Sequence, residues 1–334
     1  MNKHRENLMK RYVKPLQLIL LAIFLMSGCG EKSRVKVLKL AHVLDTTHPV
    51  HKGMAFMAEK VAEKSGGKMR VDIYPGGQLG AERDLIELLQ IGSLAMTKVS
   101  TAPLEAFVPE MKIFGVPYVF RDDEHRWKVL QGPLGKQLLL SGEDFFLRGM
   151  CYYDAGSRSF YTKDRNILKP EDLAGLKIRV MKSITSVKMV QALGGSATPI
   201  PWGELYTSLQ QGVVDGAENN PPSFYLSRHY EVCKYYSLDE HTAVPDILLM
   251  STVVWKGLSE QEQGWVQSAV DESVAYQKIL WKEASQHALD EVQKAGVIVS
   301  YPDKAPFREA VRSMHESYRG TRIYDLIQEI ENIR

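Results

Sequence analysis

The feature that most constrains the fold is a helical periodicity that runs without interruption from Ser259 to about Ala295. Ser259 and Glu262 have the spacing of a capping box, and Gly296 ends the pattern. A helix of about 36 residues would be about 54 Å long at 1.5 Å per residue, which exceeds the diameter of a small domain. We therefore expect this helix to bridge two domains, and a chain of 334 residues is long enough to form them.

Strand-like and helix-like patterns alternate before that helix. Apolar residues are interrupted by lysines at 35–43 and recur with helical spacing at 50–65. The other expected segments are strands at 69–74, 94–99, 150–154 and 177–181, and helices at 81–91, near 122–141, at 184–193 and at 202–212. This alternation predicts an α/β fold with a largely parallel sheet.

The first 29 residues differ from the rest of the chain. A basic leader that ends at Lys14 precedes a mostly apolar run at 16–26, and small residues stand directly before Cys29. This order is that of a signal peptide, and a run of about 11 residues is too short to span a bilayer comfortably. The small pair resembles a lipobox, which implies that residues 1–28 are removed, that Cys29 is lipidated and that 29–35 is a tether. An uncleaved anchor or an ordinary signal peptide are the alternatives.

Charge and cysteine content narrow the possible partners and cross-links. The formal net charge is only +2 and the basic residues are spread along the chain, which argues against a nucleic-acid partner. Apart from Cys29, the cysteines are Cys151 and Cys233. Export would permit a disulfide, but two cysteines far apart in sequence do not demonstrate one, and we expect buried free thiols.

Sequence motifs that carry catalysis are missing. There is no G-x-S-x-G elbow, H-E-x-x-H pair, Walker loop or G-x-G-x-x-G, and the glycines at 76–80 have the spacing of a turn. His42, His48 and His51 lie close together in the sequence. Their spacing, with Asp45 nearby, matches no strong zinc motif, so we expect no metal. His42 remains a candidate ligand contact, because it ends the first strand, where open α/β sheets bind ligands.

Two arginines occupy positions that favour anion binding. Arg158 follows a strand, where the chain is expected to open into a loop. Arg179 alternates with Ile178 and Val180 inside a short apolar strand. A buried arginine rarely lacks a partner, and its planar guanidinium pairs with a carboxylate through two hydrogen bonds. That carboxylate belongs either to a ligand or to an internal Asp or Glu, and the residues alone leave both possibilities open.

An aromatic and two amide side chains follow further along the chain. Trp202 begins a helix, where it is either a core residue or a platform for a ligand. Asn219 and Asn220 stand directly before Pro221, and amides both donate and accept, which suits the hydroxyl groups of a ligand. Turn formation before proline is the alternative role for the two asparagines.

Several long segments carry a family resemblance. They are Ile73-Tyr74-Pro75 with 78–83, Phe114-Gly115-Val116-Pro117-Tyr118-Val119-Phe120, Gly175-Leu176-Lys177-Ile178-Arg179-Val180, the segment 209–219, and the long helix after Ser259. In these segments the chain resembles the DctP-type solute-binding proteins of tripartite ATP-independent periplasmic (TRAP) transporters, of the type that binds sugar acids or uronates. The resemblance extends over essentially the whole mature chain, and the order of the motifs makes it specific.

The resemblance implies a two-domain periplasmic-binding-protein-like fold with a hinge, crossing strands and a long helix spanning both domains. Domain I would comprise 36–155 plus about 245–284, and domain II would comprise 156–244 plus about 285–334. Arg179 matches the family's arginine that pairs with the substrate carboxylate. The other implied contacts are a second arginine, the asparagine that ends an Asp-Gly-x-Glu-Asn motif, an aromatic residue below the ligand, two first-domain contacts and a position near the cleft: Arg158, Asn219, Trp202, Glu82 with Ser100, and His241.

Two arginines in one cleft favour an anionic ligand, and the aromatic and amide side chains would recognise its hydroxyl groups. We therefore expect an exported, lipid-anchored, monomeric protein that captures a sugar acid (a hexuronate or aldonate) for TRAP permease subunits, without a cofactor. A C4-dicarboxylate or another organic acid is the alternative within the family. The distant alternatives are a secreted sugar-acid enzyme that uses Glu82 and His241, and a metal-binding protein that uses the early histidines.

Overall fold

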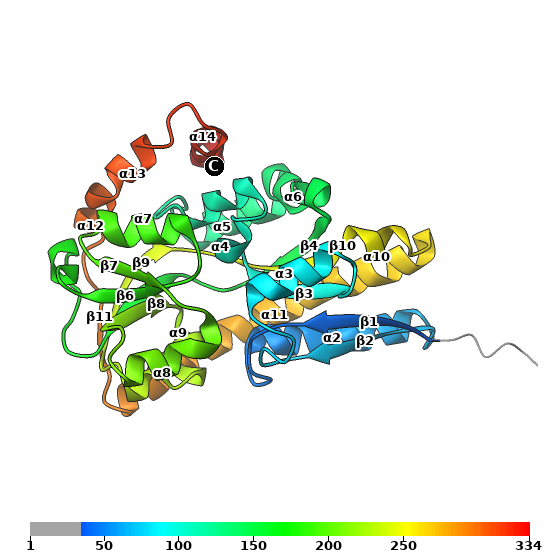
Figure 1. The fold of residues 1–334 in the computed structure, drawn as a ribbon, viewed down its shortest axis with the longest axis horizontal. Coiled ribbons are helices and arrows are strands. Elements are labelled where there is room, and N and C mark those ends of the chain that lie inside the picture. The colour runs from blue at the N-terminus through cyan, green and yellow to red at the C-terminus, as the bar shows by residue number, and fades with distance from the viewer. Residues whose placement is uncertain (1–34) are drawn as a thin grey trace, which may run out of the picture. The chain divides into compact units, whose positions relative to one another are not determined.

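The computed structural model describes residues 35–334, and their strands form two separate sheets (Figure 1). The first sheet contains, in spatial order, β2 (Met69–Tyr74), β1 (Lys36–Ala41), β3 (Met96–Ser100), β10 (Asp246–Ser251) and β4 (Leu147–Tyr153). The second contains β11 (Ile298–Ser300), β9 (Tyr235–Thr242), β5 (Arg158–Thr162), β8 (Gly216–Asn219), β6 (Lys177–Val180) and β7 (Ser196–Pro199). Each sheet with the helices packed on it forms one lobe, called the first and the second lobe.

Helices surround both sheets (Figure 1). The α-helices are α2 (Pro49–Lys64), α3 (Glu82–Gln90), α4 (Thr101–Leu104), α5 (Asp123–Gln131), α6 (Pro133–Leu140), α7 (Ile184–Ala192), α8 (Leu205–Gln210), α9 (Pro221–Leu226), α10 (Thr252–Lys256), α11 (Glu260–Lys294), α12 (Ala305–Ala310), α13 (Arg312–Glu316) and α14 (Arg322–Asn332). The 3₁₀ turns are η1 (Pro109–Gly115), η2 (Glu143–Phe145), η3 (Pro170–Leu173), η4 (Trp202–Glu204) and η5 (His229–Glu231). The helical stretch expected near 122–141 is two helices, because Pro133 has no N–H to continue the first one.

Both sheets are mixed, whereas the sequence pattern predicted a largely parallel sheet. β3 is parallel to β1 but antiparallel to β10, which is also antiparallel to β4. In the second sheet β5 is antiparallel to β8 and β9, while β6 is parallel to β7 and β8. The antiparallel pairs involve strands that arrive directly from the other lobe, and such strands need no helical crossover of the kind that parallel pairing requires.

Two short connections and one helix link the lobes. β4 continues into β5 through residues 154–157, and β9 continues into β10 through residues 243–245. Gln277 of α11 binds both backbone polar groups of Asp154, the first residue of this connection. Its side-chain oxygen accepts a hydrogen bond from Asp154 N at 2.8 Å, and its side-chain nitrogen donates to Asp154 O at 2.8 Å. This connection between the lobes is therefore hydrogen-bonded to α11.

The predicted long helix is confirmed as α11, which has 35 residues and begins with the capping box of Ser259 and Glu262. At 1.5 Å per residue it is about 52 Å long. Its buried Val266 and Val270 belong to a hydrophobic cluster with β1 and α2 of the first lobe. Its buried Val292 belongs to a cluster of the second lobe, and α11 packs on both α2 and α9 (Figure 1). The helix thus contributes to both cores.

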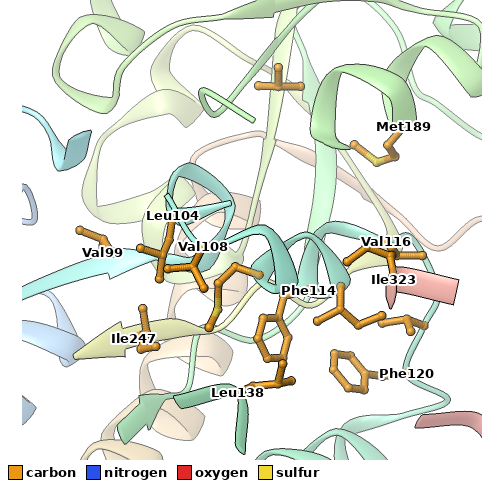
Figure 2. Close-up of a cluster of buried hydrophobic side chains, with 14 of the residues drawn as sticks. Val99, Leu104, Val108, Phe114, Val116, Phe120, Leu138, Met189, Ile247 and Ile323 are labelled. Carbon is orange, nitrogen blue, oxygen red and sulfur yellow. The ribbon is translucent and has the colours of Figure 1, made fainter. Parts of the chain in front are cut away.

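The largest hydrophobic cluster draws on segments that are far apart in the sequence. Figure 2 shows part of it, with Val99 of β3, Phe114 of η1, Leu138 of α6, Met189 of α7 and Ile323 of α14 among the labelled side chains. The C-terminal helix is also held by hydrogen bonds, from Arg121 Nη1 to Glu331 O at 3.0 Å and between His125 Nε2 and Ile330 O at 3.0 Å. α14 therefore packs on the 109–125 segment, which lies within the expected domain I, whereas α14 itself lies within the expected domain II.

Several expectations concern the rest of the chain. Cys151 and Cys233 are buried free thiols as predicted, and burial raises the pKa of both. Within residues 35–334 there is no helix with the length and apolar character needed to cross a membrane. The expected signal peptide and the lipidation site Cys29 lie outside the described residues.

Candidate functional site

Arg179 brings a buried positive charge into the space between the lobes. It lies in β6, and since side chains alternate along a strand, it extends from the face opposite to the buried Ile178 and Val180. Arg179 is 2% exposed, and its Nε donates to Ile200 O at 2.8 Å. Within residues 35–334 its buried Nη1 has no hydrogen-bond partner, and the guanidinium forms no ion pair. Burial lowers the pKa of Arg179, because the nearby carboxylates do not offset the loss of water around its charge.

Arg158 differs from Arg179 because its charge is already compensated. It begins β5 rather than a loop, and it lies beside Glu218 and Asn219 of β8. Its Nε and Nη2 both bind the Glu218 carboxylate, and its Nη1 donates to Asn219 Oδ1 at 2.8 Å. Burial would raise the pKa of Glu218, but Arg158 and His241 outweigh burial and lower that pKa to about 2. The sequence leaves open whether each arginine pairs with a ligand or with an internal carboxylate. For Arg158 the partner is internal, and it is Glu218.

The two asparagines keep donors available on the wall of the second lobe. Asn219 Oδ1 accepts hydrogen bonds from Arg158 and from Asn220 N, the latter at 2.9 Å. Asn220 caps α9, because its Oδ1 accepts from Ser223 N at 2.9 Å. In the described part of the chain no hydrogen bond uses the side-chain NH₂ of either residue. The ring of Trp202 lies 6.0 Å from the Arg179 guanidinium.

The first lobe contributes a charged cluster that the sequence revealed only in part. Lys98 and Ser100 lie on the same side of β3, and Asp246 of β10 is the direct cross-strand neighbour of Ser100. Lys98 Nζ lies 2.8 Å from Asp246 Oδ1 and 3.7 Å from Glu82 Oε1. Ser100 N donates to Glu82 Oε1 at 2.9 Å, and Ser100 Oγ donates to Asp246 Oδ1 at 3.0 Å. One buried ammonium thus holds two carboxylates.

These side chains line a cavity of about 40 Å³ between the two lobes. Six of the predicted contacts line it: Arg179, Arg158, Asn219, Trp202, Glu82 and Ser100. An adjoining cavity of about 410 Å³ shares Glu82, Arg179 and Trp202 and extends past the glycines at 76–80. The inner cavity has room for only a few water molecules. A larger solute therefore fits in the inner cavity only if the residues that line it move.

His42, another predicted contact, lies behind this wall and does not line the cavity. Its Nε2 is 3.0 Å from His51 Nδ1, and its own Nδ1 accepts from Leu44 N at 3.1 Å. Burial lowers the pKa of His42 to about 3, so the ring is neutral at physiological pH. Val43 and Leu44 line the cavity in its place, because the strand ends and the chain turns at this point.

His241 lines a different cavity, of about 1170 Å³, beside the two hinge connections. Its Nδ1 is 2.8 Å from Asp239 Oδ2, and its Nε2 is 3.6 Å from Glu218 Oε2. Burial would lower the pKa of His241, but the two carboxylates raise it to about 9. His241 therefore stabilises the charged Glu218 carboxylate from the side away from the inner cavity. Glu82 and His241, paired in the enzyme alternative, line separate cavities.

The early histidines do not gather into a metal centre in the described part of the chain. His48 has another role, as the N-cap of α2: its Nδ1 accepts from Val50 N at 3.2 Å. The ring proton is then on Nε2, which donates to Ser223 Oγ at 3.4 Å. Because His48 belongs to the first lobe and Ser223 to the second, this hydrogen bond joins the two walls of the cleft. Histidine is not among the preferred N-cap residues, so neither the cap nor the bond to Ser223 could be expected from the sequence.

Comparison with known proteins places this geometry in a family context. Residues 40–321 match the family model described as bacterial extracellular solute-binding protein, family 7. Among curated proteins, the uncharacterised protein YiiZ of Salmonella typhimurium is 39% identical over 303 residues, which cover 89% of this chain and 92% of that protein.

Solved structures are similar over most of the chain. A TRAP periplasmic solute-binding protein from Bradyrhizobium sp. BTAi1, in complex with α/β-D-galacturonate, is 40% identical with a TM-score of 0.86. A second one, from Xanthobacter autotrophicus Py2 with bound β-D-galacturonate, is 37% identical with a TM-score of 0.86. Each comparison covers 89% of this chain and 100% of the other.

Proposed function

Because the chain belongs to the bacterial extracellular solute-binding proteins of family 7, we propose that it captures a sugar acid between its two lobes for a TRAP transporter. The solute is a hexuronate such as galacturonate, which the two similar solved structures contain. The protein binds and releases this solute unchanged and hands it to the membrane permease subunits.

The observation that carries this proposal is the unpaired guanidinium of Arg179. It is buried, its Nη1 has no partner within residues 35–334, and it lines the cavity between the lobes. A carboxylate would supply both the missing charge and acceptors that match the planar fork of the guanidinium. Arg158 is less suited to bind a solute carboxylate, because its guanidinium already pairs with the Glu218 carboxylate.

Hydroxyl recognition is supported by the polar groups around Arg179. The NH₂ groups of Asn219 and Asn220 can donate, and the Glu82 carboxylate can accept. A sugar hydroxyl both donates and accepts, so it can satisfy either kind of group. The ring of Trp202 adds an apolar surface next to the guanidinium. A polyhydroxylated acid matches this set better than an unsubstituted dicarboxylate does.

The domain boundaries follow the two sheets in this proposal. Domain I comprises 36–155 and about 245–284, and domain II comprises 156–244 and the chain after 285, except that α14 belongs with the domain I surface on which it packs. The residues at 154–157 and 243–245 form the hinge. The mature protein is a monomer outside the cytoplasm, anchored to a membrane by a lipid on Cys29.

The anchor predicts that Cys29→Ser will prevent lipidation, because the thiol is the group that the lipid would modify. We expect the variant to appear in the soluble fraction or to remain unprocessed, and to lose metabolic labelling with a fatty acid. Cys151→Ser, which removes a buried thiol, is the matched control and should keep the label. Equal labelling of Cys29→Ser and the wild type would refute the anchor.

The proposed solute predicts a specific calorimetric result. Galacturonate or glucuronate should bind the purified protein, and its neutral methyl ester should bind at least roughly thirty-fold more weakly, because the ester cannot pair with a buried guanidinium. The ester keeps the shape and hydroxyl groups of the acid, so the difference isolates the charge. No heat of binding and no rise in melting temperature with any hexuronate or aldonate would contradict the proposed function.

A further inference from the structure

The two walls of the cleft carry opposite excess charge. On the first lobe, the carboxylates of Glu82 and Asp246 face a single ammonium, that of Lys98. The second lobe contributes the guanidinium groups of Arg158 and Arg179 and one carboxylate, that of Glu218, which pairs with Arg158. All five of the residues other than Glu218 line the same cavity. A solute with one carboxylate should therefore place it against the second lobe and turn its uncharged end toward the first.

Lys98 could bind a second carboxylate of a solute, but the carboxylates of Asp246 and Glu82 already lie next to its ammonium group. Its side chain is 3% exposed, and Asp246 Oδ1 lies 2.8 Å from its Nζ. Glu82 Oε1 is at 3.7 Å, and the same oxygen accepts the hydrogen bond from Ser100 N. Within residues 35–334 the other oxygens, Glu82 Oε2 and Asp246 Oδ2, receive no hydrogen bond. They are acceptors that suit the O–H donors of a polyol.

We propose that Asp246 and Glu82 make the cleft specific for monocarboxylates, by occupying Lys98 and repelling a second carboxylate at the end of the solute away from Arg179. This inference rests on the proposed capture of a sugar acid. Asp246 is the stronger determinant, because it is the closer of the two carboxylates to Lys98. Without it, Lys98 Nζ would keep only the more distant carboxylate of Glu82 as a partner.

The physical basis is the weak screening inside a closed cleft. A carboxylate placed against the first lobe would meet two like charges with little water between them, and Lys98 can compensate only one charge. A hydroxyl at the same place carries no charge and can donate to Oδ2 or Oε2. Discrimination then depends on a repulsive element as well as on the attractive one at Arg179.

The test compares D-galacturonate with D-galactarate, its oxidation product with a carboxylate at each end, by calorimetry on folded proteins. We expect the wild type to bind the uronate at least roughly 100-fold more tightly, which corresponds to about 2.7 kcal/mol. In Asp246→Asn this ratio should fall by roughly tenfold or more, because Lys98 becomes available to the second carboxylate. Glu82→Gln should lower the ratio by less.

The exposed Glu87→Gln, on the same helix as Glu82, is the matched control for a change of net charge and should leave the ratio unchanged. Wild-type binding of galactarate within threefold of galacturonate would overturn the inference, as would an unchanged ratio in Asp246→Asn. If Asp246→Asn does not fold, an unchanged ratio in Glu82→Gln counts against it in the same way. Absence of uronate binding in the wild type would instead refute the proposed function, and the inference with it.

Discussion

Replacing Arg179 with alanine should weaken uronate binding by roughly thirty-fold to several-thousand-fold. The guanidinium is buried and has no internal carboxylate partner in the described chain, so the solute carboxylate would be its counterion. Removal of one partner from a buried charge pair costs about 2–5 kcal/mol of binding free energy, and about 1.4 kcal/mol corresponds to tenfold. Arg179→Lys should lose much of the affinity as well, because an ammonium cannot reproduce the two parallel hydrogen bonds.

The stability of the solute-free protein separates this role from a structural one. Arg179→Met keeps most of the volume and removes a desolvated charge, so its free energy of unfolding should equal or exceed that of the wild type. Arg312→Ala, which removes an exposed guanidinium from α13, should alter neither property. Calorimetry on folded Arg179→Ala that shows binding within about threefold of wild type would disprove the carboxylate anchor.

Replacing Glu218 with glutamine should destabilise the fold by about 3–5 kcal/mol, because the change leaves the buried Arg158 without its counterion. The variant also deprives His241 of one of its two carboxylates. Chemical denaturation measures the loss, and the surface pair of the half-buried Glu291 and the exposed Lys294 supplies the control. Glu291→Gln should leave the free energy of unfolding almost unchanged. A Glu218→Gln protein as stable as that control would show that the cluster contributes little.

The pKa shifts of Glu218 and His241 also predict how the free energy of unfolding changes with pH. The pKa of Glu218 is lowered from its ordinary 4.5 to about 2, so the stability it contributes is present above pH 4.5 and is lost as the pH falls toward 2. The pKa of His241 is raised from 6.5 to about 9, so its contribution is complete below pH 6.5 and is lost as the pH rises through 9. The cluster should therefore stabilise the wild type most between pH 4.5 and 6.5. Glu218→Gln should show a smaller loss on the acid side.

Elements whose signal is local could be predicted from the sequence. α11 is the clearest case, because its capping box, its periodicity and Gly296 all lie within or beside the helix itself. β9 was not predicted, since Asp239 and His241 are buried in it although both are charged residue types. Their burial depends on partners elsewhere in the chain, such as Glu218 and the backbone of Phe160. A pattern of apolar residues cannot reveal a strand of this kind.

The candidate site shows the same limit. Arg179 and Arg158 were identified because an arginine beside or inside an apolar strand is unusual on its own. Lys98 and Asp246 carried no such signal, because their importance arises from the antiparallel register that places β10 beside β3. His42 was expected in the cleft because it ends a strand, but the turn of the chain after β1 points Val43 and Leu44 there instead.

The hydrogen bond between His48 and Ser223 has a kinetic consequence. It joins the lobes through His48, which does not line the cavity, and it must break whenever the cleft opens. Such a bond lengthens the residence time of every solute equally, because it slows opening without favouring one captured molecule over another. His48 would then set how fast the solute is released. A change at His48 would alter the rate of delivery without altering the preference among acids.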